Sequence, residues 1–309
     1  MKAELCTQLS KHVYHLSLPT NIGVIALDST NGETPVYLID SGNDDSIAQI
    51  LLDFLNEKFT NPKLCAIINT HSHADHCGAN KLLKEKTGCQ IWASRGEGAM
   101  MEFPQIETSL IWGGNALKDI RTKYFVAATC HADKKFLNNA VLQAGDLKIE
   151  SIPLPGHYLD QTGFIIHDTD GINSAFLGDA ISGRNILKKY WIQYLLDEQT
   201  MKDSLVKISK LKADFYIPGH GQAVTEIEGL AELNILALLE TENLILEELS
   251  SPKTTEQILK AVAERNDLQM KLSQYVLIGS TVRAYLTSLY DAEKITYQIK
   301  DNIFYWSKI

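Results

Sequence analysis

The stretch HSHADH, residues 71–76, places three histidines and one aspartate within six consecutive positions, directly after the apolar run CAIIN. Neutral imidazole and carboxylate groups suit a borderline metal ion such as zinc, which takes about four ligands at roughly 2.0–2.2 Å. His71 and His73 lie two positions apart in a loop, so both can point into the same cleft. Asp75 and His76 fall where a helix should begin and can face a neighbouring point. Two pairs of ligands in one stretch therefore predict a metal site and suggest two ions.

The segments around this stretch alternate between strand and helix patterns. Short runs rich in β-branched and aromatic residues predict strands within 12–27, 35–42, 63–69, 89–94, 140–154, 162–170, 172–179 and 213–221. Apolar residues at helical spacing predict helices at 44–59, 74–88 and 198–211, and residues 96–136 are less regular. This alternation predicts an α/β core, with the metal ligands directly after a buried strand.

The pattern changes after about residue 222. A long helical pattern covers 226–249, a capped helical pattern covers 254–266, one or two further helices are expected within 273–295, and residues 295–309 alternate about a polar turn like a hairpin. Three helices followed by a hairpin suggest a winged-helix-like module. We therefore expect a catalytic domain over residues 1–222 and a helical, winged-helix-like domain over residues 223–309.

Composition narrows the classes of protein. The chain has 309 residues and a formal net charge of −9, which argues against tight non-specific binding to nucleic acid. Five cysteines without paired spacing predict reduced thiols, and there is no apolar run of about 18 residues that would cross a membrane. The start, MKAELCTQLSKHVYHL, lacks the apolar core of a secretory signal, so a cytoplasmic location is expected. A small-molecule substrate is the expected partner, and the chain could form a homodimer through the helical segment ILALLETENLIL at 235–246.

Four further short motifs accompany H-x-H-x-D-H, namely LIDSG, PLPGHYLDQTGF, AFLGDAISG and YIPGHG. In this order the five motifs resemble the metallo-β-lactamase superfamily over roughly residues 10–222. The resemblance implies a four-layer αββα sandwich, to which the helical, winged-helix-like domain is appended.

The resemblance also implies a role for each motif residue. The first metal ion is expected on His71, His73 and His157, the second on Asp75, His76 and His220, and Asp179 is expected to bridge them. Asp40 is expected to hold a ligand histidine in place from behind. Asp75 is also expected to act in catalysis, by orienting the attacking hydroxide and passing a proton to the leaving group.

The reaction implied is hydrolysis of an intracellular ester, thioester or phosphodiester by a hydroxide that bridges two divalent ions, Zn²⁺ or else Fe or Mn. Two alternatives remain. NTHSHADH also resembles sulfur dioxygenases, in which one iron is held by two histidines and an aspartate, here His71, His157 and Asp179. An endoribonuclease or nucleic-acid-binding protein that uses the winged-helix-like tail is the other. However, residues 251–309 hold just eight Lys and Arg against six Asp and Glu, so nucleic acid is weakly supported.

Three side chains are candidates for contact with the substrate. Tyr158 directly follows a ligand histidine, and Arg184 lies past the bridging aspartate, where a cation could meet an anionic substrate. Trp112 belongs to the segment LIWGGN, which could form an aromatic lid over a metal cleft. Each of the three also has a plainer interpretation as a packing or surface residue.

Overall fold

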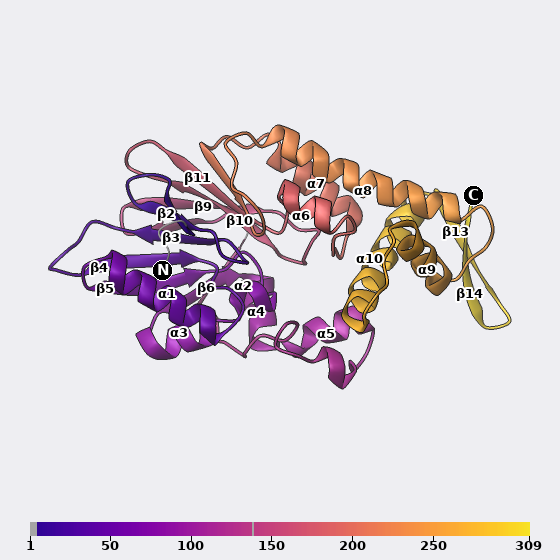
Figure 1. Ribbon diagram of the computed structural model, residues 1–309, viewed down its shortest axis with the longest axis horizontal. Helices are drawn as coiled ribbons and strands as arrows, with labels where there is room; N and C mark the ends of the chain where they lie inside the picture. Colours follow the sequence, from indigo (N-terminus) through magenta and orange to yellow (C-terminus); the bar gives the residue numbers. More distant parts are fainter. Residues whose placement is uncertain (1–4, 138) are drawn as a thin grey trace.

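The β-branched and aromatic runs of the chain form two β-sheets that face each other in the computed structural model, which describes residues 5–137 and 139–309 (Figure 1). Over these residues the first sheet has seven strands in chain order, β1 (Cys6–Gln8), β2 (Val13–Leu16), β3 (Ile22–Ala26), β4 (Thr34–Ile39), β5 (Pro62–Ile68), β6 (Gln90–Ser94) and β7 (Lys134–Phe136). The second has five, in the order β12 (Phe215–Pro218), β11 (Asn173–Gly178), β10 (Thr162–His167), β9 (Leu147–Pro153) and β8 (Val141–Ala144).

Helices cover the outer face of each sheet and complete four layers. The helices are α1 (Asp45–Lys58), α2 (Ala74–Cys77), α3 (Asn80–Thr87), α4 (Arg95–Glu102), α5 (Gln105–Trp112), η2 (Lys118–Ile120), α6 (Arg184–Lys189), α7 (Glu198–Ile208), α8 (Glu228–Glu248), α9 (Thr255–Arg265) and α10 (Leu272–Asp291). Buried apolar side chains of α1 and α3 pack on the first sheet, and those of α7 and α8 pack on the second. A third cluster, which includes Ile68, Phe164 and Phe176, fills the space between the sheets. The predicted αββα sandwich is confirmed.

One predicted helix is interrupted. The sequence pattern favours a continuous helix over 74–88, but the structure has two helices, α2 and α3, separated at Gly78 and Ala79. Gly78 lies so close to the carbonyl of Asn43 that a Cβ there would be 2.2 Å from its oxygen, and Ala79 donates its N–H to Gly42 at 3.2 Å. This docking on the loop after β4 ends the first helix early, which periodicity alone does not reveal.

The C-terminal region contains the predicted three helices and hairpin. Thr254 and Gln257 form a reciprocal capping box at the start of α9, as the sequence indicated. Strands β13 (Ile295–Lys300) and β14 (Ile303–Lys308) pair through a turn at Asp301 and Asn302, which both have a positive φ, as a tight two-residue hairpin turn requires. A single helix, α10, forms where one or two were expected.

These C-terminal helices pack on the sandwich and share one apolar core with its second sheet. Figure 1 shows α8 running outward from the sandwich and α10 returning toward α5. The N-terminal part of α10 contacts the α5 region, where Val276 packs with Ile111 and Ile120. The domain boundary at residue 222 and the winged-helix assignment stay predictions.

The cysteines and the apolar segments bear on the predictions from composition. All five cysteines, which are Cys6, Cys65, Cys77, Cys89 and Cys130, are free thiols in the structure. Within the described part of the chain, no helix has the length and apolar character needed to cross a membrane. Most of the run at 235–246 packs inward along α8, whereas Leu236 and Leu239 are exposed, so the homodimer also stays a prediction.

Candidate metal centre

The expected ligands converge because each follows a strand at the same end of the sandwich. β4 runs parallel to β5, and β11 runs parallel to β12, so the carboxyl ends of each pair lie together. Asp40 follows β4, the HSHADH stretch follows β5, Asp179 follows β11 and His220 follows β12. His157 lies in the loop between β9 and β10. Gly219 is required beside them, since a Cβ there would lie 2.0 Å from Oδ1 of Asp179.

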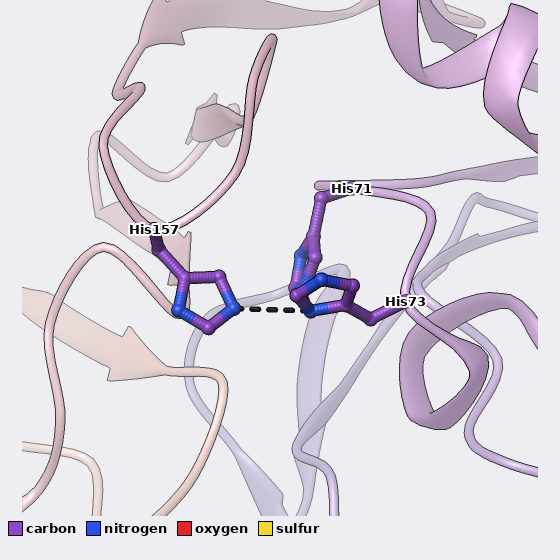
Figure 2. Close-up of side chains that lie close together, drawn as sticks. All are labelled: His71, His73 and His157. Carbon is purple, nitrogen blue, oxygen red and sulfur yellow. Dashed lines mark hydrogen bonds between the residues drawn. The ribbon is translucent and has the colours of Figure 1, made fainter. Parts of the chain in front are cut away.

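The first group consists of His71, His73 and His157 (Figure 2). Nε2 of His71 lies 3.1 Å from Nδ1 of His73, and Nε2 of His157 lies 3.0 Å from the same atom. Three imidazole nitrogens thus face one point. Ligand atoms about 2.0–2.1 Å from a tetrahedral ion stand roughly 3.3 Å apart, so this spacing is close to that of a metal site.

The second group consists of Asp75, His76 and His220. Nε2 of His220 lies 3.1 Å from Oδ2 of Asp75, and Nε2 of His76 lies 3.9 Å from that oxygen. Asp179 lies between the two groups, with Oδ2 3.6 Å from Nε2 of His157 and 3.4 Å from Nε2 of His220. This is the position that a carboxylate shared by two ions needs.

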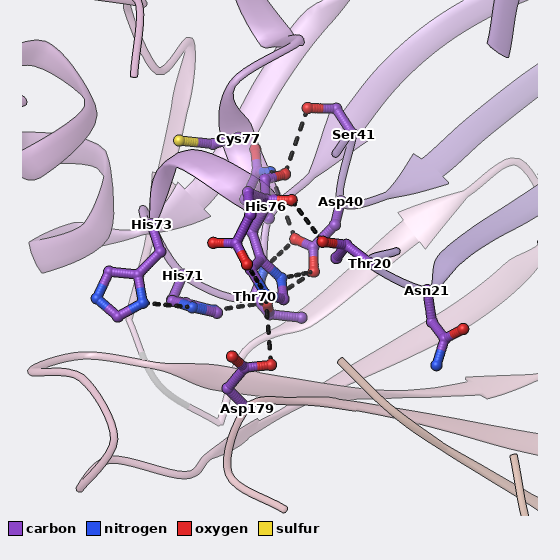
Figure 3. Close-up of polar contacts among 12 residues, drawn as sticks. Thr20, Asn21, Asp40, Ser41, Thr70, His71, His73, His76, Cys77 and Asp179 are labelled. Atoms are coloured by element: carbon purple, nitrogen blue, oxygen red, sulfur yellow. Dashed lines mark hydrogen bonds and ion pairs between the residues drawn. The ribbon is translucent and has the colours of Figure 1, made fainter. Parts of the chain in front are cut away.

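A network behind the ligands fixes two of the imidazole rings (Figure 3). Nδ1 of His76 lies 2.8 Å from Oδ2 of Asp40, as the sequence led us to expect. Thr70 donates its hydroxyl to the same oxygen at 2.8 Å and its N–H to Oδ1 at 2.8 Å. Because the hydroxyl proton goes to Asp40, the Thr70 oxygen is free to accept from Nδ1 of His71 at 3.0 Å. Asp40 therefore supports one histidine of each group, which leaves Nε2 to face the centre.

Backbone carbonyls orient two further ligands. Nδ1 of His157 lies 2.9 Å from the carbonyl oxygen of Tyr194, and Nδ1 of His220 lies 2.8 Å from that of Pro19. A carbonyl can only accept, so in each ring Nδ1 is the protonated nitrogen. In the neutral form of each ring, Nε2 then carries the lone pair that a metal ion would use.

Burial keeps the first group neutral. Desolvation lowers the pKa of His73 and of His157 to about 4, and it lowers the pKa of His71 well below its usual value. A protonated imidazole cannot bind a metal ion, so near pH 7 all three rings are in the form that a ligand needs.

The second group is charged in the absence of metal. Burial alone lowers the pKa of His76 and of His220, but Asp179 and Asp75 outweigh it and raise these pKa values to about 10 and about 12. Burial raises the pKa of Asp179, while His220 and His76 hold it well below its usual range. The two imidazolium ions here neutralise carboxylates that a divalent ion would otherwise neutralise.

The donor set fits divalent metal. Nε2 of His76 and Oδ1 of Asp179 are buried and lie 3.3 Å apart, close enough for an ion pair but without the geometry of a hydrogen bond. A divalent ion would offer both atoms a partner in place of this poorly aligned contact. Imidazole and carboxylate together suit zinc, iron and manganese.

Proton release should separate the two groups. His76 and His220 must each lose a proton to become ligands, whereas the first group is already neutral. We expect zinc binding at the second group to release about two protons, so its affinity rises up to about 100-fold per unit of pH between 6 and 8, while the first group shows almost no dependence. Zinc is titrated into metal-free protein in unbuffered solution, and the base needed to hold the pH constant measures the number of protons released in each step. Equal proton release in the two steps would contradict it.

Comparison with known proteins places this geometry in a family. The family model of the metallo-beta-lactamase superfamily matches residues 17–220, which include every one of the expected ligands. The chain belongs to the metallo-β-lactamase superfamily. The superfamily assignment accounts for the two facing sheets and for the position of the histidine-rich stretch after β5.

Relatives and solved structures extend the comparison. A hydroxyacylglutathione hydrolase of Rhodopseudomonas palustris is 27% identical over 158 residues, which are 51% of this chain and 48% of that protein. The hydroxyacylglutathione hydrolase GloC of Haemophilus influenzae is 27% identical over 196 residues, which are 62% of this chain and 83% of that protein. The chain thus spans about half the length of the first of these curated relatives. A beta-lactamase domain protein from Burkholderia ambifaria has the same fold, with a TM-score of 0.75 at 17% identity over 98% of this chain and 94% of that one.

Two buried glutamates take part in the centre without any sequence signal. Glu97 accepts the N–H and hydroxyl of Ser72 at 2.9 and 2.7 Å and the N–H of Asp160 at 2.9 Å, so it ties the HSHADH loop to the loop of His157. Oε1 of Glu107 lies 3.5 Å from Nε2 of His73. Burial raises the pKa of both carboxyls to about 7. Both lie in the segment 96–136 or at its edge, where the sequence pattern is irregular.

Two adjoining cavities reach the centre. The large cavity, about 500 Å³, is bordered by His157, Asp179 and His220, and the small cavity, about 290 Å³, by His73, Asp75 and Glu107. Both include Tyr194 and Leu277 in their walls. The side chain of Asp75 is 44% exposed toward this space.

The three candidates for substrate contact lie elsewhere. Tyr158 is buried behind His73, with ring centroids 4.3 Å apart. Arg184 is exposed at the start of α6, and Trp112 is exposed at the end of α5. Among the described residues that line the two cavities, these three do not occur. Their roles in substrate binding stay predictions, and Tyr190, Trp191 and Tyr194 are the aromatic residues that the large cavity presents.

Proposed function

We propose that this protein is a dinuclear metal-dependent hydrolase that cleaves a thioester or ester of a small molecule. The observation that carries the proposal is the presence of two complete ligand groups on either side of Asp179, at the floor of a cavity. When bound, two divalent ions lower the pKa of water to ~7 and polarise the oxygen of the bond to be cleaved.

The residues of the chain have distinct roles in this proposal. His71, His73 and His157 would hold the first ion and Asp75, His76 and His220 the second, with the carboxylate of Asp179 available to either group. The interaction with His76 and His220 keeps Asp75 ionised, since together they lower its pKa against the effect of burial. Its carboxylate faces the small cavity, where it can orient the attacking water and carry a proton to the leaving group. Asp40 fixes the orientation of the His76 ring, and Thr70 fixes that of the His71 ring.

We favour a thioester as the bond that is cleaved because the curated relatives are named as hydrolases of a thioester. Proteins named hydroxyacylglutathione hydrolase align with 51% and 62% of this chain at 27% identity. A thioester also leaves as a thiolate, so it needs less help from a general acid than an amine or alkoxide. Asp75 is the group expected to pass a proton to the leaving group, and because its pKa lies below the usual value it is ionised near pH 7, so it can donate only a proton that it first takes from the attacking water.

The rival functions have less support. A mononuclear iron dioxygenase needs His71, His157 and Asp179 alone and leaves the full group of Asp75, His76 and His220 without a purpose. For nucleic acid binding, five of the eight Lys and Arg residues over 251–309 are engaged by carboxylates, Arg265 among them. Lys253 pairs with Glu248, Lys260 with Glu264, Arg283 with Glu256 and Lys294 with Glu242. Paired cations attract phosphate less strongly, which favours a small-molecule substrate.

Metal analysis and a thioester assay test the proposal together. Protein purified without chelators should carry about two equivalents of divalent metal and should hydrolyse S-lactoylglutathione or acetyl-coenzyme A, followed by release of free thiol. Removal of metal by a chelator should stop turnover, and added zinc should restore it. One equivalent of iron with oxygen uptake on a persulfide, and no thiol release from any thioester, would overturn it in favour of the dioxygenase.

A further inference from the structure

The large cavity beside the metal centre is mostly apolar. Its floor is formed by His157, Asp179 and His220, and its walls rise from two parts of the chain that are distant in sequence. One wall is the segment from α6 to the start of α7, with Ile186, Trp191 and Ile192. At about 500 Å³ it is in the range of ~300–1,000 Å³ that is usual for small-molecule sites.

The other wall comes from the C-terminal helices. Leu268 follows α9, while Leu277 and Ile278 lie on α10 and are half-buried. Packing of Val276 against Ile111 in the α5 region fixes this part of α10, so the wall is held on both sides. The C-terminal region thus closes the space above the ligand residues with three aliphatic side chains, accompanied by the amides of Asn266 and Gln274.

We propose that this cavity binds the acyl group of the substrate and that the acyl group is apolar and of medium length, rather than a small hydroxyacyl or acetyl group. The inference rests on the proposed hydrolase and names its substrate class. An acyl carbon held above Asp179 places the rest of the acyl chain against Ile192, Leu277 and Ile278. In the hydrolysis, water adds to this carbon, the carbon–sulfur bond breaks, and the thiol and the free acid are released.

The charges around the cavity agree with an acyl thioester. Lys188 and Lys189 lie at the exposed rim, and within the described lining Asp179, itself an expected ligand, is the one carboxylate. Glutathione and coenzyme A both carry anionic groups on the thiol side of the ester, so the rim suits either carrier. The cavity wall therefore selects the acyl group, and the rim accepts an anionic carrier.

Chain length provides the first test. Each methylene that moves from water into an apolar wall strengthens binding about fourfold. We expect kcat/KM of the metal-loaded protein to rise at least about 100-fold from acetyl to octanoyl thioesters, with both glutathione and coenzyme A as carrier. The protein should also bind free octanoate more tightly than free acetate. Calorimetry measures these two affinities without any turnover.

A matched pair of substitutions on α10 locates the effect. Ile278→Trp fills the cavity and should cut kcat/KM for octanoyl at least about 10-fold, with acetyl turnover within about threefold of wild type. Leu272→Trp, on an exposed part of the same helix outside the cavity, should leave the octanoyl-to-acetyl ratio unchanged. Octanoate binding to each variant, with circular dichroism as the check on folding, tests the same contact without the reaction.

The outcomes separate this inference from the proposed function. Hydrolysis of all thioesters at similar kcat/KM, with no preference of octanoate over acetate in binding, would overturn the acyl cavity and keep the hydrolase. A different result is that wild-type protein binds octanoate, that Ile278→Trp does not, and that no thioester is hydrolysed. This result would keep the acyl-binding cavity and overturn the proposed thioester hydrolase. If Ile278→Trp does not fold, the chain-length series of the wild-type protein still decides.

Discussion

A variant with both His71→Ala and His73→Ala is expected to retain little metal and to lose thioester hydrolysis. These rings supply two of the three nitrogens of the first group, and His71 also lies beside His76 and Asp179 in a third group of ligand-type atoms. Residues that act as one unit in catalysis typically cost about 10⁴-fold or more when removed. We expect a loss of kcat/KM on that order, together with fewer than one equivalent of metal per chain by elemental analysis.

The control for this variant uses histidines outside the centre. His131 pairs with Glu102 at the surface, and His167 pairs with Glu150 and Asn173, so His131→Ala with His167→Ala removes the same number of rings. This control should keep full metal content and activity. Thioester turnover near the wild-type level in the His71 and His73 variant would show that the histidine stretch is not the reactive centre.

Asp40→Asn is expected to weaken metal binding by about 10–100-fold, the usual cost of removing a group that supports a metal ligand. The amide nitrogen of asparagine is a donor, so it opposes the N–H at Nδ1 of His76 that Asp40 now accepts at 2.8 Å. The ring then favours the other tautomer, with the proton on Nε2, and Nε2 no longer faces the centre with a lone pair. Asp40 has a φ of 61°, a conformation that asparagine tolerates, so the fold should survive.

Competition with a chelator measures this effect. At a suitable chelator concentration, wild-type protein should keep both equivalents of zinc. At the same concentration, Asp40→Asn should lose at least the zinc ion held by Asp75, His76 and His220. The matched control is Asp28→Asn, which removes a carboxylate that is 74% exposed and pairs with Lys11. Its zinc affinity should equal that of wild type. Equal retention of zinc by Asp40→Asn and wild type would contradict the supporting role of Asp40.

Sequence reasoning named the expected ligands, which the fold brings close together, because their signal is local. His71, His73, Asp75 and His76 lie within one turn after a strand, and short loops with Gly and Pro carry the others. The α/β core followed from alternating strands and helices, and the αββα sandwich followed from the resemblance to the superfamily. The break at Gly78 and the strand β7 did not follow from the sequence, because tertiary contacts decide them.

The surroundings of the ligands were less accessible to sequence reasoning. Glu97 and Glu107 reach the centre from α4 and α5, and nothing in their own segment marks a buried carboxylate. The walls of the large cavity join residues 186–194 with residues 266–278, which only the fold brings together. Candidates chosen for being near a ligand in sequence, such as Tyr158, lie behind the site instead.

The position of α10 has a consequence for how such a protein can diverge. The wall that α10 contributes lies beyond His220 in the chain, and the apolar side chains of Leu277 and Ile278 cannot form a hydrogen bond with any expected ligand. Under the proposed acyl specificity, substitutions at Leu268, Leu277 or Ile278 alter the choice of substrate while the ligand residues stay unchanged. Selection can act on recognition and on catalysis through separate mutations, so a new specificity is accessible without passing through an inactive ancestor.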